Sequence, residues 1–163
     1  MPIDATSSTV DHFISGIGVD RSTSGATARI GLTYYFYSNR SCIAATCQLD
    51  VGFIFSTNGG ASWSSATQLA GPMTLSWVAN TSQGRMVGDY ISTSVRNGAN
   101  AFPVIAVAPT APSGGTFNEA MYVPTGGLAI TGGARRALAG PVLAPSGTGR
   151  LAAPGSGSLR RAC

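Results

Sequence analysis

Charge is scarce in this sequence, and lysine is missing altogether. Only 10% of the 163 residues are charged, against about 25% in typical soluble proteins. All ten basic residues are arginine, a bias that GC-rich coding produces. No apolar run approaches the roughly 18 residues that span a bilayer, and no segment repeats with a helical period. We therefore expect neither a membrane-spanning segment nor a helical bundle.

The formal charge of +4 arises at one end of the chain. Residues 1–131 contain five arginines and six acidic residues, whereas residues 132–163 contain five arginines and no acid. The arginines of the second segment are spread out and have no aromatic neighbours, so we expect no nucleic-acid partner. The same segment is rich in Gly, Ala, Pro and Ser, which predicts a disordered low-complexity tail or a frame-shifted end rather than a packed element.

Residues that bind metals or phosphates are few. His12 is the single histidine, so the sequence contains neither a Ser-His-Asp triad nor a zinc site, and no glycine-rich phosphate loop occurs. We predict no metal and no cofactor. Cys42 and Cys47 lie close together without histidine partners, which favours a short-loop disulfide over a metal site. The chain opens without the pattern of a signal peptide.

Short apolar or alternating runs separated by turn residues predict an all-β fold. All 13 aromatic residues lie between Phe13 and Tyr122, which marks the folded part as residues 1–131. The predicted strands are 13–19, 28–37, 48–56, 73–79, 85–95, 101–108 and 116–123, with a last one at 127–131. They fall into two groups of four, at about 12–79 and 85–131. The second group is close in length to a propeller blade, and the first is longer because of an insertion around residues 38–46. Two blades do not close a ring, so we expect either part of something larger or a smaller β fold.

One turn motif stands out between two of these strands. Ser56, Gly60 and Trp63 match the pattern S-x-D-x-G-x-T-W, with Asn58 at the Asp position and Ser62 at the Thr position. A tight hairpin needs a side chain that bonds to its own turn, a glycine with positive φ and an aromatic anchor. The motif resembles the Asp-box, or bacterial neuraminidase repeat. In that family it joins the third and fourth strands of a blade, away from the catalytic pocket, so we expect Trp63 to be a structural anchor.

Three further stretches widen the resemblance. Residues 88–90 (Gly-Asp-Tyr) and the runs 101–108 and 117–122 look like the closing blade of bacterial sialidase-like Asp-box propellers. The resemblance implies a partial β-propeller of about two four-stranded antiparallel blades and a secreted, extracellular location. It also implies a glycan or sialoside ligand, and contacts with the rest of a propeller or self-association through exposed edge strands.

The family's chemistry suggests candidate catalytic residues. Sialidases hold a carboxylate with three arginines and use a Tyr–Glu pair as nucleophile, with an Asp as acid/base. Here the resemblance implies Tyr90 as nucleophile or substrate contact, Arg85 or Arg96 as carboxylate ligand and Glu119 as the partner of the tyrosine. The alternative is structural: Asp89 orders a turn, Tyr90 fills core between blades, and Glu119 is an exposed carboxylate at a strand edge. The Arg-Ile-Pro motif that opens many sialidases is absent.

Three hypotheses follow. The first is a fragment of a sialidase-like glycoside hydrolase of exo-α-sialidase type, which we expect to be inactive alone. The second is a non-catalytic Asp-box propeller module that binds glycan or protein. The third is a small independent β domain.

Overall fold

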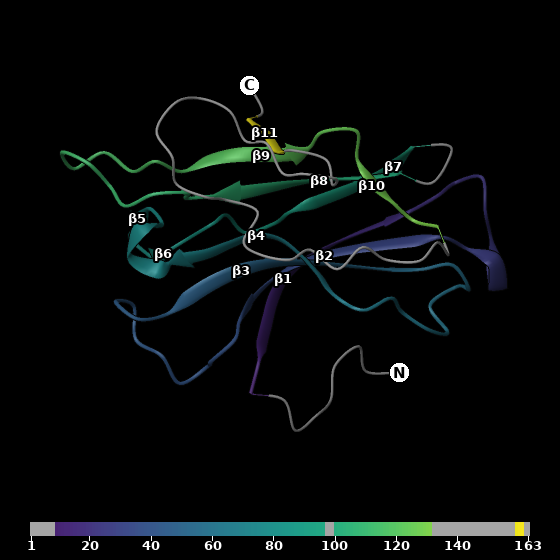
Figure 1. The fold of residues 1–163 in the computed structure, drawn as a ribbon, viewed down its shortest axis with the longest axis horizontal. Helices are drawn as coiled ribbons and strands as arrows, with labels where there is room; N and C mark the ends of the chain where they lie inside the picture. Colours follow the sequence, from purple (N-terminus) through teal and green to yellow (C-terminus); the bar gives the residue numbers. More distant parts are fainter. Residues whose placement is uncertain (1–8, 97–99, 132–158, 162–163) are drawn as a thin grey trace.

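A computed structural model describes residues 9–96, 100–131 and, as backbone, 159–161. In these residues the fold is all-β, with two layers of antiparallel strands (Figure 1). Neither sheet closes on itself. In the described part of the chain, no helix has the length and apolar character needed to cross a membrane.

The first sheet contains four strands in sequence order, each antiparallel to the next. They are β1 (Asp11–Val19), β2 (Ile30–Tyr37), β3 (Gln48–Ser56) and β4 (Thr67–Thr74). Aromatic and β-branched residues dominate β2 and β3, as the pleated and half-buried surface of a sheet favours.

The second sheet is built around one long central strand. Its members are β7 (Ser92–Arg96), β8 (Asn100–Val107), β9 (Ala120–Pro124), β10 (Leu128–Ala129) and β11 (Leu159–Arg161). β7 pairs with one side of β8, whereas β9 and β10 pair with successive parts of the strand. β11 extends the sheet beyond β9.

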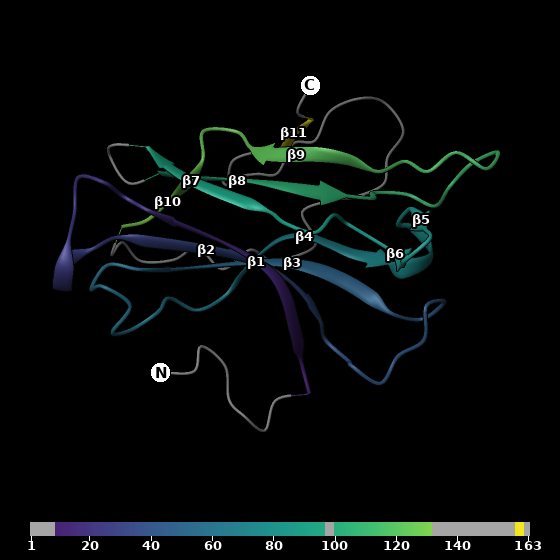
Figure 2. The same ribbon diagram turned by 180° about the vertical axis from the view of Figure 1, so that it is seen from behind.

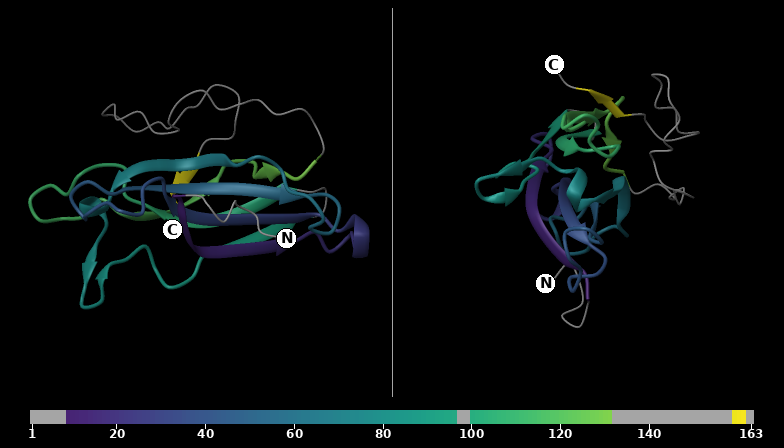
Figure 3. Two further views of the ribbon diagram at one scale, coloured as in Figure 1. Left: turned by 90° about the horizontal axis from the view of Figure 1, so that it is seen from below. Right: turned by 90° about the vertical axis from the view of Figure 1, so that its left-hand side faces the viewer.

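The connection between the sheets, residues 75–91, has little regular structure. It contains a 3-10 turn (Leu75–Trp77) and a hairpin of β5 (Asn80–Thr81) and β6 (Gly84–Arg85). The hairpin projects away from the sheets in the left view of Figure 3. Val78, Val87 and Ile91 are buried in the core, so three apolar side chains anchor the connection.

The two sheets stack face to face (Figure 2). Two glycines in β1 allow this strand to approach β7 closely. A Cβ atom on Gly16 would lie 2.7 Å from the carbonyl oxygen of Ile91, and one on Gly18 would overlap the carbonyl oxygen of Thr93. No residue with a side chain fits between β1 and β7 at these two positions. The glycines therefore set the spacing of the two layers.

Buried hydroxyl groups join the two layers. Tyr35 in β2 donates a hydrogen bond to the carbonyl of Ala106 and accepts one from its N–H, both at 2.8 Å. Thr93 donates to the carbonyl of Gly16 at 3.0 Å and shares a hydrogen bond of 3.0 Å with the hydroxyl of Thr33. Because buried polar groups must be paired, these contacts fix how the sheets face one another.

The strand registers place the loops at two opposite ends of the molecule. The turns at 20–29 and 56–66 lie together at one end, which we call the turn end, since Val19 pairs with Ile30 and Ile30 pairs with Ser56. The opposite end holds the loop 38–47, the connection 75–91 and the loop 108–119 (Figure 1). We call it the cavity end, because a cavity opens there.

Several predicted strands shift in the structure. The run 48–56 is confirmed as β3, whereas 73–79 is wrong after Thr74, where a 3-10 turn follows. The predicted strand 85–95 begins only at Ser92, since the backbone before it makes the connection between the sheets. Extended backbone near 127–131 does occur, but β10 pairs with β8 instead of adding a strand beyond β9.

The predicted tail is only partly described. Residues 132–158 and 162–163 lie outside the described residues, so the prediction of disorder applies to a segment beyond this description. At Leu159–Arg161 the structure instead has a strand that pairs with Pro124, Val123 and Tyr122. Composition alone did not predict this pairing.

Candidate functional site

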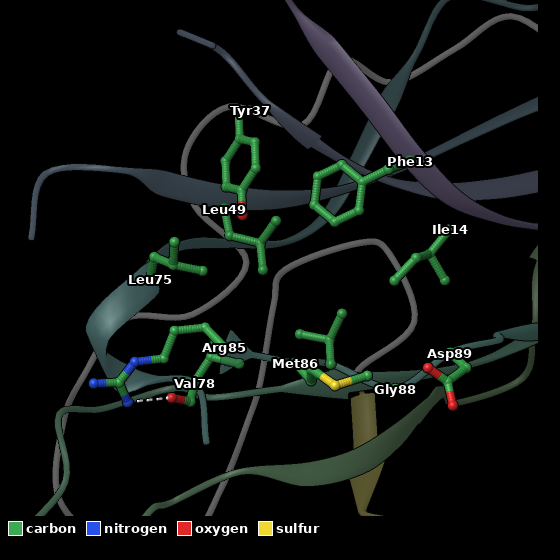
Figure 4. A pocket seen from close by; sticks show the side chains of 11 residues that line it. Phe13, Ile14, Tyr37, Leu49, Leu75, Val78, Arg85, Met86, Gly88 and Asp89 are labelled. Atoms are coloured by element: carbon green, nitrogen blue, oxygen red, sulfur yellow. Dashed lines mark hydrogen bonds between the residues drawn. The ribbon is translucent and has the colours of Figure 1, made fainter. Parts of the chain in front are cut away.

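A cavity of about 320 Å³ opens at the cavity end (Figure 4). Its walls come from β1, β2, β3 and the connection between the sheets. The lining residues are Phe13, Ile14, Tyr37, Leu49, Leu75, Val78, Arg85, Met86, Val87, Gly88 and Asp89. Its volume lies at the lower end of the range for small-molecule sites.

A bulge in β1 supplies two consecutive residues to this cavity. The register of β1 with β2 shifts between Phe13 and Gly16, and Ile14 has a φ of 43°. In a regular strand, neighbouring side chains point to opposite faces, yet Phe13 and Ile14 both line the cavity. A β-branched residue in the left-handed region costs about 1–3 kcal/mol, and such strain is concentrated at functional sites.

Among the described residues that line the cavity, three bring polar side chains to it: Tyr37, Arg85 and Asp89. The Tyr37 hydroxyl points inward, near Leu49 (Figure 4). Burial and then the nearby charge of Asp11 raise the pKa of Tyr37, so at neutral pH its hydroxyl stays protonated and can both donate and accept. Phe13 and Tyr37 lie against each other, with ring centroids 5.0 Å apart.

The predicted carboxylate ligand Arg85 is engaged with the backbone. Its Nη1 donates to the carbonyl of Val78 at 2.7 Å, and its guanidinium lies 5.5 Å from the ring centre of Phe117. Figure 4 shows the guanidinium turned toward this carbonyl, with Asp89 on the opposite side of the cavity. The methylene stem of Arg85 therefore faces the cavity more than its charge does.

Glu119 holds the other side of the same peptide group. Its Oε2 accepts a hydrogen bond of 2.8 Å from the N–H of Ala79, and Ala79 follows Val78 in the chain. Arg85 and Glu119 thus bind the carbonyl and the N–H of one peptide bond, an arrangement that we call the peptide clamp. The clamp ties the connection between the sheets to the loop 108–119.

The other predicted catalytic residues lie apart from this cluster. Tyr90 is 90% exposed and does not line the cavity, so the prediction that it fills core is wrong for the isolated chain. Arg96 lies near the turn end, 5.9 Å from the ring centre of Phe102. Among the described residues, no hydrogen bond or ion pair joins Tyr90, Arg85 and Glu119. Of the arginines in residues 9–96 and 100–131, Arg85 alone lines the cavity, so these residues do not form the three-arginine cluster of a sialidase.

The turn at residues 56–63, which we call the Asp-box turn for its resemblance to that motif, has the bonding predicted for it. Ser56 donates to Oδ1 of Asn58 at 2.9 Å and accepts from the N–H groups of Asn58 and Gly60. Asn58 also accepts from the N–H of Ser62 and donates to its hydroxyl, at 2.9 and 2.8 Å. Gly60 has a φ of 88°, and a Cβ there would lie 3.8 Å from the half-buried ring of Trp63. The turn joins β3 to β4 at the turn end.

The cysteine prediction also agrees with the structure. Cys42 and Cys47 form a disulfide within the loop 38–47, and Cys47 is buried. Cys163 lies outside the described residues. Within the described part of the chain, no group of three or more His, Cys, Asp or Glu residues is placed to bind a metal ion.

Sequence reasoning missed Asp50, a buried carboxylate near the start of β3. It accepts hydrogen bonds from Gln68 at 2.7 Å and Ser38 at 3.5 Å, and Gly71 lies directly against it. Burial raises the pKa of Asp50 to about 6. An acidic residue within the apolar run of β3 was the signal available in the sequence.

We expect Asp50→Asn to raise the free energy of unfolding by about 1 kcal/mol at pH 7.5 and to change this free energy little at pH 4. The folded state holds the Asp50 proton more tightly than the unfolded state, where the pKa is near 3.8. The stability from that proton is present below pH 3.8 and is lost as pH rises through 6. Urea unfolding at both pH values measures the difference in stability between Asp50→Asn and the wild type, with Asp89→Asn as the exposed control. Equal effects of Asp50→Asn at both pH values would contradict this assignment.

Comparison of the chain with family models, with curated proteins and with solved structures gave no match.

Proposed function

We propose that the chain is a module of a sialidase-like Asp-box β-propeller, part of a glycoside hydrolase of exo-α-sialidase type that is inactive without further blades. The carrying observation is the Asp-box turn, which joins the third and fourth strands of the first sheet at the end opposite the cavity. This is the position that the family resemblance implies for such a turn.

The stacking of the sheets supports the assignment to neighbouring blades. β1 and β7 are the first strands of their sheets and approach each other through Gly16 and Gly18. The exposed face of β1 carries Ile17, 61% exposed, and Val19, 46% exposed. Apolar side chains on an open edge strand favour association with another sheet. The Cys42–Cys47 disulfide suits an oxidising, extracellular compartment.

The described residues supply only part of a sialidase site, which supports the expected inactivity of the isolated chain. Arg85 is the one arginine among the described residues that line the cavity, and the clamp engages it. A sialoside carboxylate would need a bidentate guanidinium that is free to turn toward it. Tyr90 has no described acidic partner that could activate it as a nucleophile.

The test is turnover of a fluorogenic sialoside by the purified chain. We expect no release of fluorophore above the buffer rate from the wild type or from Tyr90→Phe, with an active sialidase as positive control. Turnover that Tyr90→Phe abolishes would overturn the predicted inactivity and assign Tyr90 as nucleophile.

Light scattering on the same sample tests the propeller assignment. Association through open sheets supports this assignment, whereas a compact monomer with a cooperative melt indicates an independent β domain.

The peptide clamp favours a second candidate, a non-catalytic propeller module that binds glycan. Arg85 and Glu119 both hold backbone atoms in the structure, which is a structural use of two candidate catalytic residues. Binding of sialyllactose without cleavage, followed by NMR, would favour this function over hydrolysis.

A further inference from the structure

Apolar groups make up most of the cavity at the cavity end. Phe13, Ile14, Leu49, Leu75, Val78, Met86 and Val87 contribute hydrocarbon or thioether surface. The two charged side chains lie at its sides, and the guanidinium of Arg85 turns away toward the carbonyl of Val78 (Figure 4). A strongly polar sugar ring would lose its hydration here without finding enough partners.

Aromatic and sulfur-bearing walls suit a flat aromatic ligand. The rings of Phe13 and Tyr37 lie together at one side, and the side chain of Met86 lies at another. Ring stacking and sulfur–aromatic contacts both favour an aromatic guest. The Tyr37 hydroxyl is the polar group that points inward (Figure 4).

We propose that this cavity binds a flat aromatic group that carries a hydroxyl or carbonyl substituent, with the ring against Phe13 and the substituent at the Tyr37 hydroxyl. The β1 bulge, which directs Ile14 into the cavity in a strained backbone conformation, is part of this site. The inference goes beyond the proposed function, because the cavity binds the aromatic group whether or not a glycan is attached.

Titration of the wild-type chain with 4-methylumbelliferone tests the proposal directly. In amide NMR spectra of ¹⁵N-labelled protein, we expect saturable shifts at Met86, Gly88 and Asp89. N-acetylneuraminic acid, a polar anionic sugar, is expected to leave these signals unchanged. The proposal is overturned if millimolar 4-methylumbelliferone causes no shifts, or if its shifts lie only at the Asp-box turn.

A matched pair of variants tests the role of the bulge. Asparagine tolerates positive φ, so Ile14→Asn keeps the backbone conformation while it places an amide in the cavity wall. We expect at least tenfold weaker binding of 4-methylumbelliferone, whereas Ile17→Asn on the exposed face of the same strand binds within twofold of wild type. Equal binding by Ile14→Asn and wild type would overturn the assignment. If Ile14→Asn does not fold, the amide shifts of the wild-type chain with 4-methylumbelliferone decide whether the cavity is the binding site.

Discussion

Replacing Gly18 with alanine is expected to destabilise the fold by about 3 kcal/mol or more. The added methyl group would overlap the carbonyl oxygen of Thr93, and the methyl of Val95 would lie 3.1 Å away. A backbone atom cannot rotate aside as a side chain can, so β1 and β7 must separate. For a domain whose total stability is about 5–15 kcal/mol, this is a large share.

Gly31 provides the matched control, since it is the register partner of Gly18 in β2. A methyl group on Gly31 would lie 3.1–3.2 Å from the side chains of Phe53, Ala101 and Ile130. The ring of Phe53 and the terminal methyl group of Ile130 can move aside by a few tenths of an ångström, and Ala101 needs a backbone shift of no more than that. We therefore expect Gly31→Ala to cost only about 1 kcal/mol. Urea unfolding measures the loss of stability of Gly18→Ala and of Gly31→Ala relative to the wild type. Equal losses would show that close approach of the backbones does not set the spacing of the sheets.

Tyr35→Phe is expected to cost about 3 kcal/mol and to lower the melting temperature by roughly 10 °C. Ala106 pairs with Met121 on its β9 side, whereas β7 reaches only as far as Ser92, opposite Val104. The Tyr35 hydroxyl therefore satisfies the N–H and C=O of Ala106 on the side that β7 leaves open. Phenylalanine would leave both groups buried and unpaired.

Tyr37→Phe is the control for this second prediction. It removes a hydroxyl from the same strand and the same face, but at the open cavity, where water can reach the remaining groups. We expect its cost to stay below about 1 kcal/mol. Thermal melts of the two variants under identical conditions decide, and a Tyr35→Phe melt equal to that of Tyr37→Phe would contradict the bridging role.

Local chemistry made the Asp-box turn predictable, whereas the cavity depends on contacts between distant segments. Ser56, Asn58, Gly60 and Ser62 form hydrogen bonds with one another, so a segment of seven consecutive residues contains the bonding of the turn. The cavity instead combines β1, Tyr37 and the connection 75–91. The sequence near Ile14 does not indicate a bulge. The alternation of apolar and polar residues in β1 covers too few residues to show that one of them is out of register.

The errors in strand boundaries have similar causes. The apolar run after Met73 predicted a strand, but Val78 and Ile91 are buried as anchors of an irregular connection. Burial requires apolar residues in loops as well as in strands, so periodicity alone cannot separate the two. The same limit explains why Arg85 was expected to begin the strand 85–95, whereas it lies in the connection between the sheets and binds the carbonyl of Val78.

The stacking of the two sheets through the glycine positions of β1 is the central claim, since the proposed assignment of the sheets to neighbouring blades rests on it. Measurement of nuclear Overhauser effects from the α-protons of Gly18 tests it most directly. We predict strong cross-peaks to a methyl group of Val95, which lies 77 residues away in the chain. Cross-peaks confined to β1 and β2 in a folded sample would contradict the arrangement.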